Sequence, residues 1–89
     1  MITKQVFVGA IKALYNVQNQ LPDESLSGLV TMLEAAMDCR PEANGKTWIR
    51  WWIEDNNFGR NQLTVALGNH DEAVETPEEL YDLLIFKKK

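Results

Sequence analysis

The one histidine of the chain stands beside two carboxylates, in His70-Asp71-Glu72. Histidine and acidic side chains can bind a metal ion together or exchange protons near neutral pH. A metal centre needs three or four converging ligands, and the sequence offers no second histidine and no pair of cysteines. We therefore interpret this segment as a polar turn. A small metal-dependent hydrolase centred on His70 is the least favoured alternative.

The other reactive groups are not arranged for catalysis. Glu54 and Asp55 are neighbours in the sequence and would point to opposite faces of a strand, so they do not make an acid/base pair. Cys39 has no base near it in the sequence. Glycine-rich phosphate loops, nucleophile elbows and zinc-ligand spacings are all missing. The sequence thus predicts no enzyme activity, no catalytic residues, no metal and no cofactor.

Two tryptophans flank an arginine at alternate positions, as Trp48, Arg50 and Trp52. In a β-strand these three side chains share one face, opposite Ile49 and Trp51. Tryptophan and arginine are enriched at the energetic centres of protein interfaces. The pattern predicts an aromatic partner-binding face. The alternative is that a helix covers this face and makes both tryptophans part of the core.

Carboxylates dominate the last quarter of the chain, where no lysine or arginine occurs between Gly68 and Phe86. The acids of this stretch are Asp71, Glu72, Glu75, Glu78, Glu79 and Asp82. One interpretation is helix capping and a solvated surface. The sharper one is a surface that presents carboxylates in place of phosphates to a basic groove of another protein, which electrostatic complementarity would steer towards it.

The net charge of −4 restricts the classes of partner. Binding to nucleic acid or to an anionic membrane needs surplus lysine and arginine, so we expect neither. A single cysteine excludes an intrachain disulfide and is typical of a reducing compartment. The sequence shows no apolar leader and no apolar run of transmembrane length. These observations predict a soluble cytoplasmic protein.

Apolar residues at helical spacing predict two helices in the N-terminal half. The first covers residues 3–18, with Thr3 as its N-cap. Its apolar stripe comprises Val6, Phe7, Ala10, Ile11, Ala13, Leu14 and Val17. The second covers residues 24–38 and follows a break at Pro22, with Asp23 as the expected cap. Its apolar face comprises Leu26, Leu29, Val30, Leu33 and Met37. The short connection predicts an antiparallel pair.

Strands are predicted in the second half. Residues 47–54 are rich in tryptophan and isoleucine and contain no breaker, which is typical of a strand. Residues 62–67 would pair with them as a hairpin, and residues 72–75 would add a short extended piece. The expected core side of the first strand carries Ile49, Trp51 and Ile53.

Thr76-Pro77-Glu78-Glu79 is the clearest local signal. It predicts an N-cap at Thr76, proline in the first turn and a capping box closed by Glu79, so a helix should cover residues 77–86. The element order is therefore α-α-β-β-β-α. It predicts a single α+β domain over residues 1–89, with an antiparallel two- or three-stranded meander and helices on one face.

Three blocks of the sequence resemble a group of small phage and prophage proteins. They are Met1-Ile2-Thr3-Lys4 with Phe7, Trp48-Ile49-Arg50-Trp51-Trp52-Ile53-Glu54, and Thr76-Pro77-Glu78-Glu79-Leu80-Tyr81-Asp82-Leu83-Leu84. That group has a helical N-terminal half, a strand with adjacent tryptophans and a final E-x-L-Y-D helix. The resemblance implies a phage context, in which small accessory proteins act on host machinery by binding. Such proteins include inhibitors of host defence, among them anti-CRISPR proteins.

The function predicted from the sequence is therefore binding of a host or phage protein, for example inhibition of a host nucleic-acid enzyme or defence complex. The contacts would come from Trp48, Arg50 and Trp52, or from the six acids named above. The alternative is a self-associating module that forms a homodimer through an open sheet face or a free edge strand.

Overall fold

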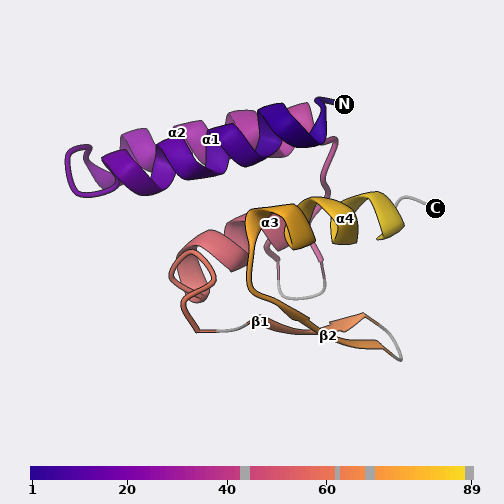
Figure 1. The fold of residues 1–89 in the computed structure, drawn as a ribbon. Helices are drawn as coiled ribbons and strands as arrows, with labels where there is room; N and C mark the ends of the chain where they lie inside the picture. The colour runs from indigo at the N-terminus through magenta and orange to yellow at the C-terminus, as the bar shows by residue number, and fades with distance from the viewer. Residues whose placement is uncertain (43–44, 62, 68–69, 88–89) are drawn as a thin grey trace.

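The computed structural model describes residues 1–42, 45–61, 63–67 and 70–87, with side chains for all of these except 63–67, 70–73 and 87. The elements in chain order are α1 (Lys4–Val17), α2 (Asp23–Ala36), α3 (Trp48–Arg50), the π-helical turn η1 (Trp51–Asp55), β1 (Leu63–Leu67), β2 (His70–Val74) and α4 (Pro77–Lys87). Helices α1 and α2 form one layer, α3 and α4 lie beneath it, and the two strands lie beyond them (Figure 1). No helix in the described part of the chain has the length and apolar character needed to cross a bilayer.

Helix α1 begins where the sequence predicts. The Thr3 hydroxyl accepts a hydrogen bond from the Val6 amide at 3.3 Å, which satisfies one of the free N–H groups of the first turn. Phe7, Ile11 and Leu14 are buried at i, i+4 and i+7. The predicted helix and its cap are confirmed. The predicted stripe was too wide, because Val6 is 55% exposed.

Helix α2 packs antiparallel to α1 but begins one residue earlier than predicted. Pro22 occupies the N-cap position in an extended conformation, and no side chain caps the helix. The prediction that Asp23 is the cap is therefore wrong, because Asp23 is the first helical residue. Its carboxylate still favours the positive end of the helix dipole. The buried residues of the α2 face are Val30 and Leu33, followed by Met37 just beyond the helix.

Residues 48–55 are helical, and the strand predicted over residues 47–54 is wrong. The Thr47 hydroxyl accepts a hydrogen bond from the Arg50 amide at 3.0 Å and so caps α3. The Thr47 carbonyl accepts from the Trp51 amide at 2.9 Å, and the Trp51 carbonyl accepts from the Asn56 amide at 3.2 Å. The second bond spans five residues and gives η1 its π-helical geometry.

Burial explains why the helix prevails over the strand propensity of tryptophan and isoleucine. Trp48, Ile49, Trp52 and Ile53 are all buried, which is an i, i+1, i+4, i+5 pattern and therefore one face of a helix. A strand would place only alternate residues of this set on the core side. Tertiary packing therefore overrides the local β preference.

The predicted α+β fold with its two- or three-stranded meander is wrong for the same reason, and the chain is mainly helical. With residues 47–54 in a helix, the segment 63–67 pairs instead with the segment that follows it. β1 and β2 are antiparallel, with Leu63 opposite Val74 and Leu67 opposite His70. This hairpin is a minor element attached to a helical core. The helices predicted at both ends of the chain are present.

Helix α4 begins at the predicted capping motif. The Glu79 amide donates to the Thr76 hydroxyl at 3.2 Å, and that hydroxyl donates to the Glu79 carboxylate at 3.0 Å. The helix then packs across the start of α1. The rings of Phe7 and Tyr81 lie 5.6 Å apart, and the Tyr81 hydroxyl donates to the Ile2 carbonyl at 3.1 Å.

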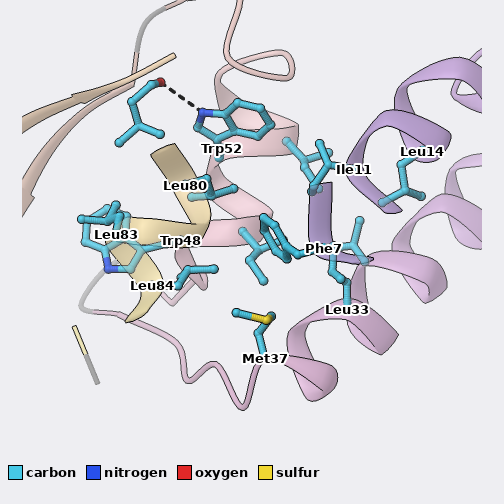
Figure 2. Close-up of a cluster of buried hydrophobic side chains, with 14 residues drawn as sticks. Phe7, Ile11, Leu14, Leu33, Met37, Trp48, Trp52, Leu80, Leu83 and Leu84 are labelled. Atoms are coloured by element: carbon cyan, nitrogen blue, oxygen red, sulfur yellow. Dashed lines mark hydrogen bonds between the residues drawn. The ribbon is translucent and has the colours of Figure 1, made fainter. Parts of the chain in front are cut away.

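Trp52 lies at the meeting point of the helices and the hairpin (Figure 2). Its side chain is 1% exposed, and its indole N–H donates to the Val74 carbonyl at 3.1 Å. Gly59 packs directly on the ring. A Cβ at Gly59 would lie 2.5 Å from Trp52 Cζ2 and 2.9 Å from the Glu75 carbonyl oxygen, and the φ of Gly59 is +80°. Only glycine fits both the contact and the left-handed backbone.

Candidate protein-binding surfaces

The predicted aromatic interface is part of the core. Trp48 and Trp52 are 6% and 1% exposed, so neither can contact a partner. Trp48 packs near Leu83 and Leu84 of α4, and Trp52 near Leu80 (Figure 2). Trp51, expected to face the core, is half-buried and stacks on Trp48 with ring centroids 5.0 Å apart. The alternative interpretation, in which a helix covers these tryptophans, matches the structure.

Arg50 is also engaged within the chain. Its guanidinium donates to both carboxylate oxygens of Glu34, at 2.9 and 3.3 Å, and to Glu54 at 2.8 Å. It donates further to the hydroxyls of Ser27 and Thr31, both at 2.9 Å. The Arg50 and Glu34 side chains are only 18% and 15% exposed. This cluster fastens α3 and η1 to α2, and it is not an available binding site.

The electrostatics of the cluster keep Arg50 charged. The hydrogen bonds that Arg50 donates to Glu34 raise the pKa of Arg50 above its ordinary value, against the opposing effect of burial and with help from the charges of Glu34 and Glu54. A raised pKa means that the stabilisation is fully present below the ordinary arginine pKa and is lost only as pH rises above it. Arg50 is therefore charged throughout the neutral range.

The described part of the acidic stretch is exposed but partly used by the fold. Glu75, Glu78, Glu79 and Asp82 all lie at the surface. The Glu79 carboxylate accepts from the Thr76 hydroxyl, and Asp82 pairs with Lys4 at 3.0 Å. Capping and ion pairing therefore account for two of these carboxylates. The side chains of Asp71 and Glu72 lie outside the described residues.

His70 lies in β2, opposite Leu67, and its side chain is outside the described residues. Among the side chains that are described, no three histidine, cysteine, aspartate or glutamate residues come together as a metal would require. The least favoured alternative, a hydrolase at His70, concerns a side chain outside the described residues and stays a prediction.

A cleft of about 540 Å³ lies between the α1–α2 turn and η1, and the sequence did not predict it. Its apolar lining residues are Leu14, Leu26, Val30, Ile53 and Phe58, and its polar lining residues are Gln18, Asn19, Asp23, Ser27, Glu54 and Asn57. The charged groups of this lining are both carboxylates, and no lysine or arginine is among the described residues that form it. We refer to this site as the cleft.

One wall of the cleft is a turn with unusual backbone geometry. Asn57 and Phe58 have φ of +50° and +58°, and Gly59 follows at +80°. A bulky residue rarely adopts such a conformation. Here packing stabilises it, because the Phe58 ring meets the Tyr15 ring edge-on at 5.4 Å and Arg60 lies 4.8 Å from the Tyr15 ring centroid.

A second hollow, of about 330 Å³, runs between α1 and α2 on their outer side. We call it the outer groove. Its lining is wholly apolar and comprises Ala10, Ala13, Leu14, Val17, Leu29, Met32 and Leu33. Leu29 and Met32 are 38% and 68% exposed. A signal for it was present in the sequence, as a second stripe of mostly small or apolar residues at 4-3-4 spacing in each helix.

No protein-family model matches this chain, and no curated protein or solved structure matches it either.

Proposed function

We propose that this chain is a non-enzymatic protein-binding module that receives a basic, apolar-tipped segment of its partner in the cleft. The observation that carries the proposal is the lining of the cleft, in which the partly exposed side chains of Leu26 and Phe58 lie with the exposed carboxylate of Asp23. Glu54 also lines the cleft, but its carboxylate already accepts a hydrogen bond from Arg50 at 2.8 Å. An apolar anchor in a pocket supplies binding free energy, and matching charges at its edge supply orientation and specificity.

The class of partner follows from the charge of the chain. A net charge of −4 and the exposed acids of α4 favour approach by a basic surface. Nucleic-acid enzymes carry such surfaces because they bind phosphates. The resemblance to phage accessory proteins adds a context in which the partner is a host enzyme or a defence complex in the host cytoplasm. Inhibition of the anti-CRISPR kind is one form of that activity.

Partner capture by charge-reversed variants tests the proposal. Asp23→Lys places a cation in the wall of the cleft, whereas Glu78→Lys makes the same charge change at an exposed position of α4, outside the cleft lining. In host lysate at about 0.15 M salt, where charges more than about 8 Å apart are screened, Asp23→Lys should lower partner capture at least tenfold. Glu78→Lys should lower it less than about twofold.

Equal losses in the two variants would show that diffuse charge, not the cleft, is recognised. Capture unaffected by Asp23→Lys would refute the assignment of the cleft. Circular dichroism of both variants is the control for folding, since both replaced side chains are exposed.

A further inference from the structure

The outer side of the α1–α2 pair carries apolar residues that the fold itself does not bury. Each helix has a second stripe at the 4-3-4 spacing of a helical-bundle seam. The stripe of α1 is Val6, Ala10, Ala13 and Val17, and that of α2 is Ser25, Leu29, Met32 and Ala36. Helices that expose such a seam pack it against other helices through interdigitated side chains. The core of this chain uses the other stripe, at Phe7, Ile11 and Leu14 and at Val30 and Leu33.

Two glycines on the exposed surface of the α1–α2 pair also favour packing of another helix on this face. Gly9 and Gly28 lie within α1 and α2, where each costs about 1 kcal/mol relative to alanine. A Cβ built on either glycine would meet no atom within 4 Å, and neither has a positive φ. Nothing in the described chain therefore requires glycine at these positions. A helix packed closely on the outer face would benefit from the missing side chains.

The charges at the edges of this face are self-complementary. Lys12 follows Ala10 of the groove by two residues, which is a rotation of about 200° around the helix axis. Lys12 therefore lies on the edge of α1 remote from α2. Glu24 precedes Leu33 of the groove by nine residues, which is a net rotation of about 180° around the helix axis. Glu24 therefore lies on the edge of α2 remote from α1. Neither residue forms an ion pair with any described part of the chain. Each edge thus carries one such charge, and the two charges are opposite in sign.

We propose that the outer groove binds the same face of a second copy of this chain and forms an antiparallel four-helix bundle. A two-fold axis parallel to the helices places α1 of each copy over α2 of the other, which brings Lys12 of one copy to the edge that carries Glu24 of the other. A two-fold axis across the helices would instead place Lys12 near Lys12 and Glu24 near Glu24. Opposite charges select the first arrangement and like charges disfavour the second.

The expected affinity is modest. Each helix has 14 residues and is about 21 Å long, and two helices side by side are about 20 Å wide. The face therefore covers about 400 Å², less than the roughly 800 Å² per partner of a standard interface. The dissociation constant should be micromolar or weaker, so association must be measured up to about 1 mM. The outer groove and the cleft share Leu14 alone among their described lining residues, and a dimer would present two clefts to a multivalent partner.

Sedimentation equilibrium of the full chain from about 5 µM to 1 mM tests the proposal. The expected result is a concentration-dependent monomer–dimer equilibrium. Met32→Glu should give a folded monomer at every concentration, because the Met32 side chain is 68% exposed and its loss leaves the core intact. Glu78→Lys, on α4, should dimerise like the unchanged chain.

A series of charge-swap variants tests whether the two-fold axis of the dimer is parallel to the helices. Lys12→Glu and Glu24→Lys should each weaken dimerisation about fivefold at low salt, and the double variant should restore it. A chain that is monomeric at 1 mM, or a dimer that Met32→Glu leaves intact, would overturn the proposal. Failure of the double variant to restore dimerisation would overturn the arrangement with α1 over α2. These outcomes do not depend on partner capture by the cleft.

Discussion

The α1–α2 pair and residues 47–61 use their apolar side chains in opposite ways. In residues 47–61 Trp48, Trp52 and both isoleucines are buried in the core, and Arg50 is held by α2. In the α1–α2 pair one apolar stripe of each helix is buried while a second stays at the surface, with Met32 as its most exposed member. The aromatic segment that looked like an interface is therefore structural. The ordinary-looking helices carry the apolar surface left for binding.

The largest expected effect on the free energy of unfolding comes from the contact between Gly59 and the ring of Trp52. Gly59→Ala should lower the free energy of unfolding by about 4 kcal/mol, because the new Cβ collides with Trp52 and with the Glu75 carbonyl and the backbone φ is +80°. Gly45→Ala is the matched control. Gly45 has a φ of +83° but no atom within 4 Å of its Cβ position, so that variant should lose about 1 kcal/mol. Urea unfolding measures both, and similar losses would mean that Trp52 does not pack on Gly59.

Two neighbouring residues of α2, one from each stripe, allow the buried and the exposed stripe to be compared directly. Leu33→Ala should cost about 3 kcal/mol, because the side chain is 6% exposed and its removal leaves a cavity. Met32→Ala should change the unfolding free energy by less than about 0.5 kcal/mol in dilute solution, because Met32 is 68% exposed. Thermal or urea denaturation at low protein concentration compares them. A large loss for Met32→Ala would place that residue in the monomer core.

Loss of the arginine cluster should lower the free energy of unfolding by less than loss of a core side chain does, but by more than loss of a surface ion pair does. Arg50→Ala leaves Glu34 mostly buried without its cation, and it should cost about 2 kcal/mol after allowance for partial exposure. Arg50→Lys keeps the charge but loses the planar guanidinium that bonds both carboxylate oxygens of Glu34, and it should cost about 1 kcal/mol. Arg40→Ala, at an exposed position, serves as the control with less than about 0.5 kcal/mol expected. Equal losses at Arg50 and Arg40 would contradict the structural role of Arg50.

The smallest effects are expected at the helix caps. Thr47→Ala removes the cap of α3 and also a 2.5 Å hydrogen bond from the Thr47 hydroxyl to Glu34, so it should cost about 1.5 kcal/mol. Thr3→Ala removes only the exposed cap of α1 and should cost about 0.5 kcal/mol. Chemical denaturation of the two variants checks the order, and a smaller loss for Thr47→Ala than for Thr3→Ala would contradict the role of Thr47 as a cap.

The sequence was sufficient where local signals and helical periodicity agreed. The caps at Thr3 and Thr76 and the stripe of Phe7, Ile11 and Leu14 located α1 and α4 to within about one residue. For residues 47–54, strand propensity and alternation outweighed two helix signals that were also present. These were a capping threonine at Thr47 and the Arg50–Glu54 pair at i, i+4, which bond at 2.8 Å in the structure. Short apolar runs are ambiguous between helix and strand, and packing against α2 and α4 decided this one.

The candidate sites were less predictable than the fold. The cleft depends on the distance between the α1–α2 turn and η1, and no local pattern encodes such a distance. The outer groove could have been found, because Val6, Val17 and Leu29 make each apolar stripe wider than a single buried face requires.

Solvent paramagnetic relaxation enhancement measured on a dilute sample tests the contrast between the two regions most directly. A soluble paramagnetic probe should leave the indole protons of Trp48 and Trp52 protected, while the methyl groups of Leu29 and Met32 relax strongly. The same methyl groups should become protected near 1 mM as the outer groove closes against a second copy. Strong relaxation at Trp48 and Trp52, or protection of Met32 in dilute solution, would contradict the account.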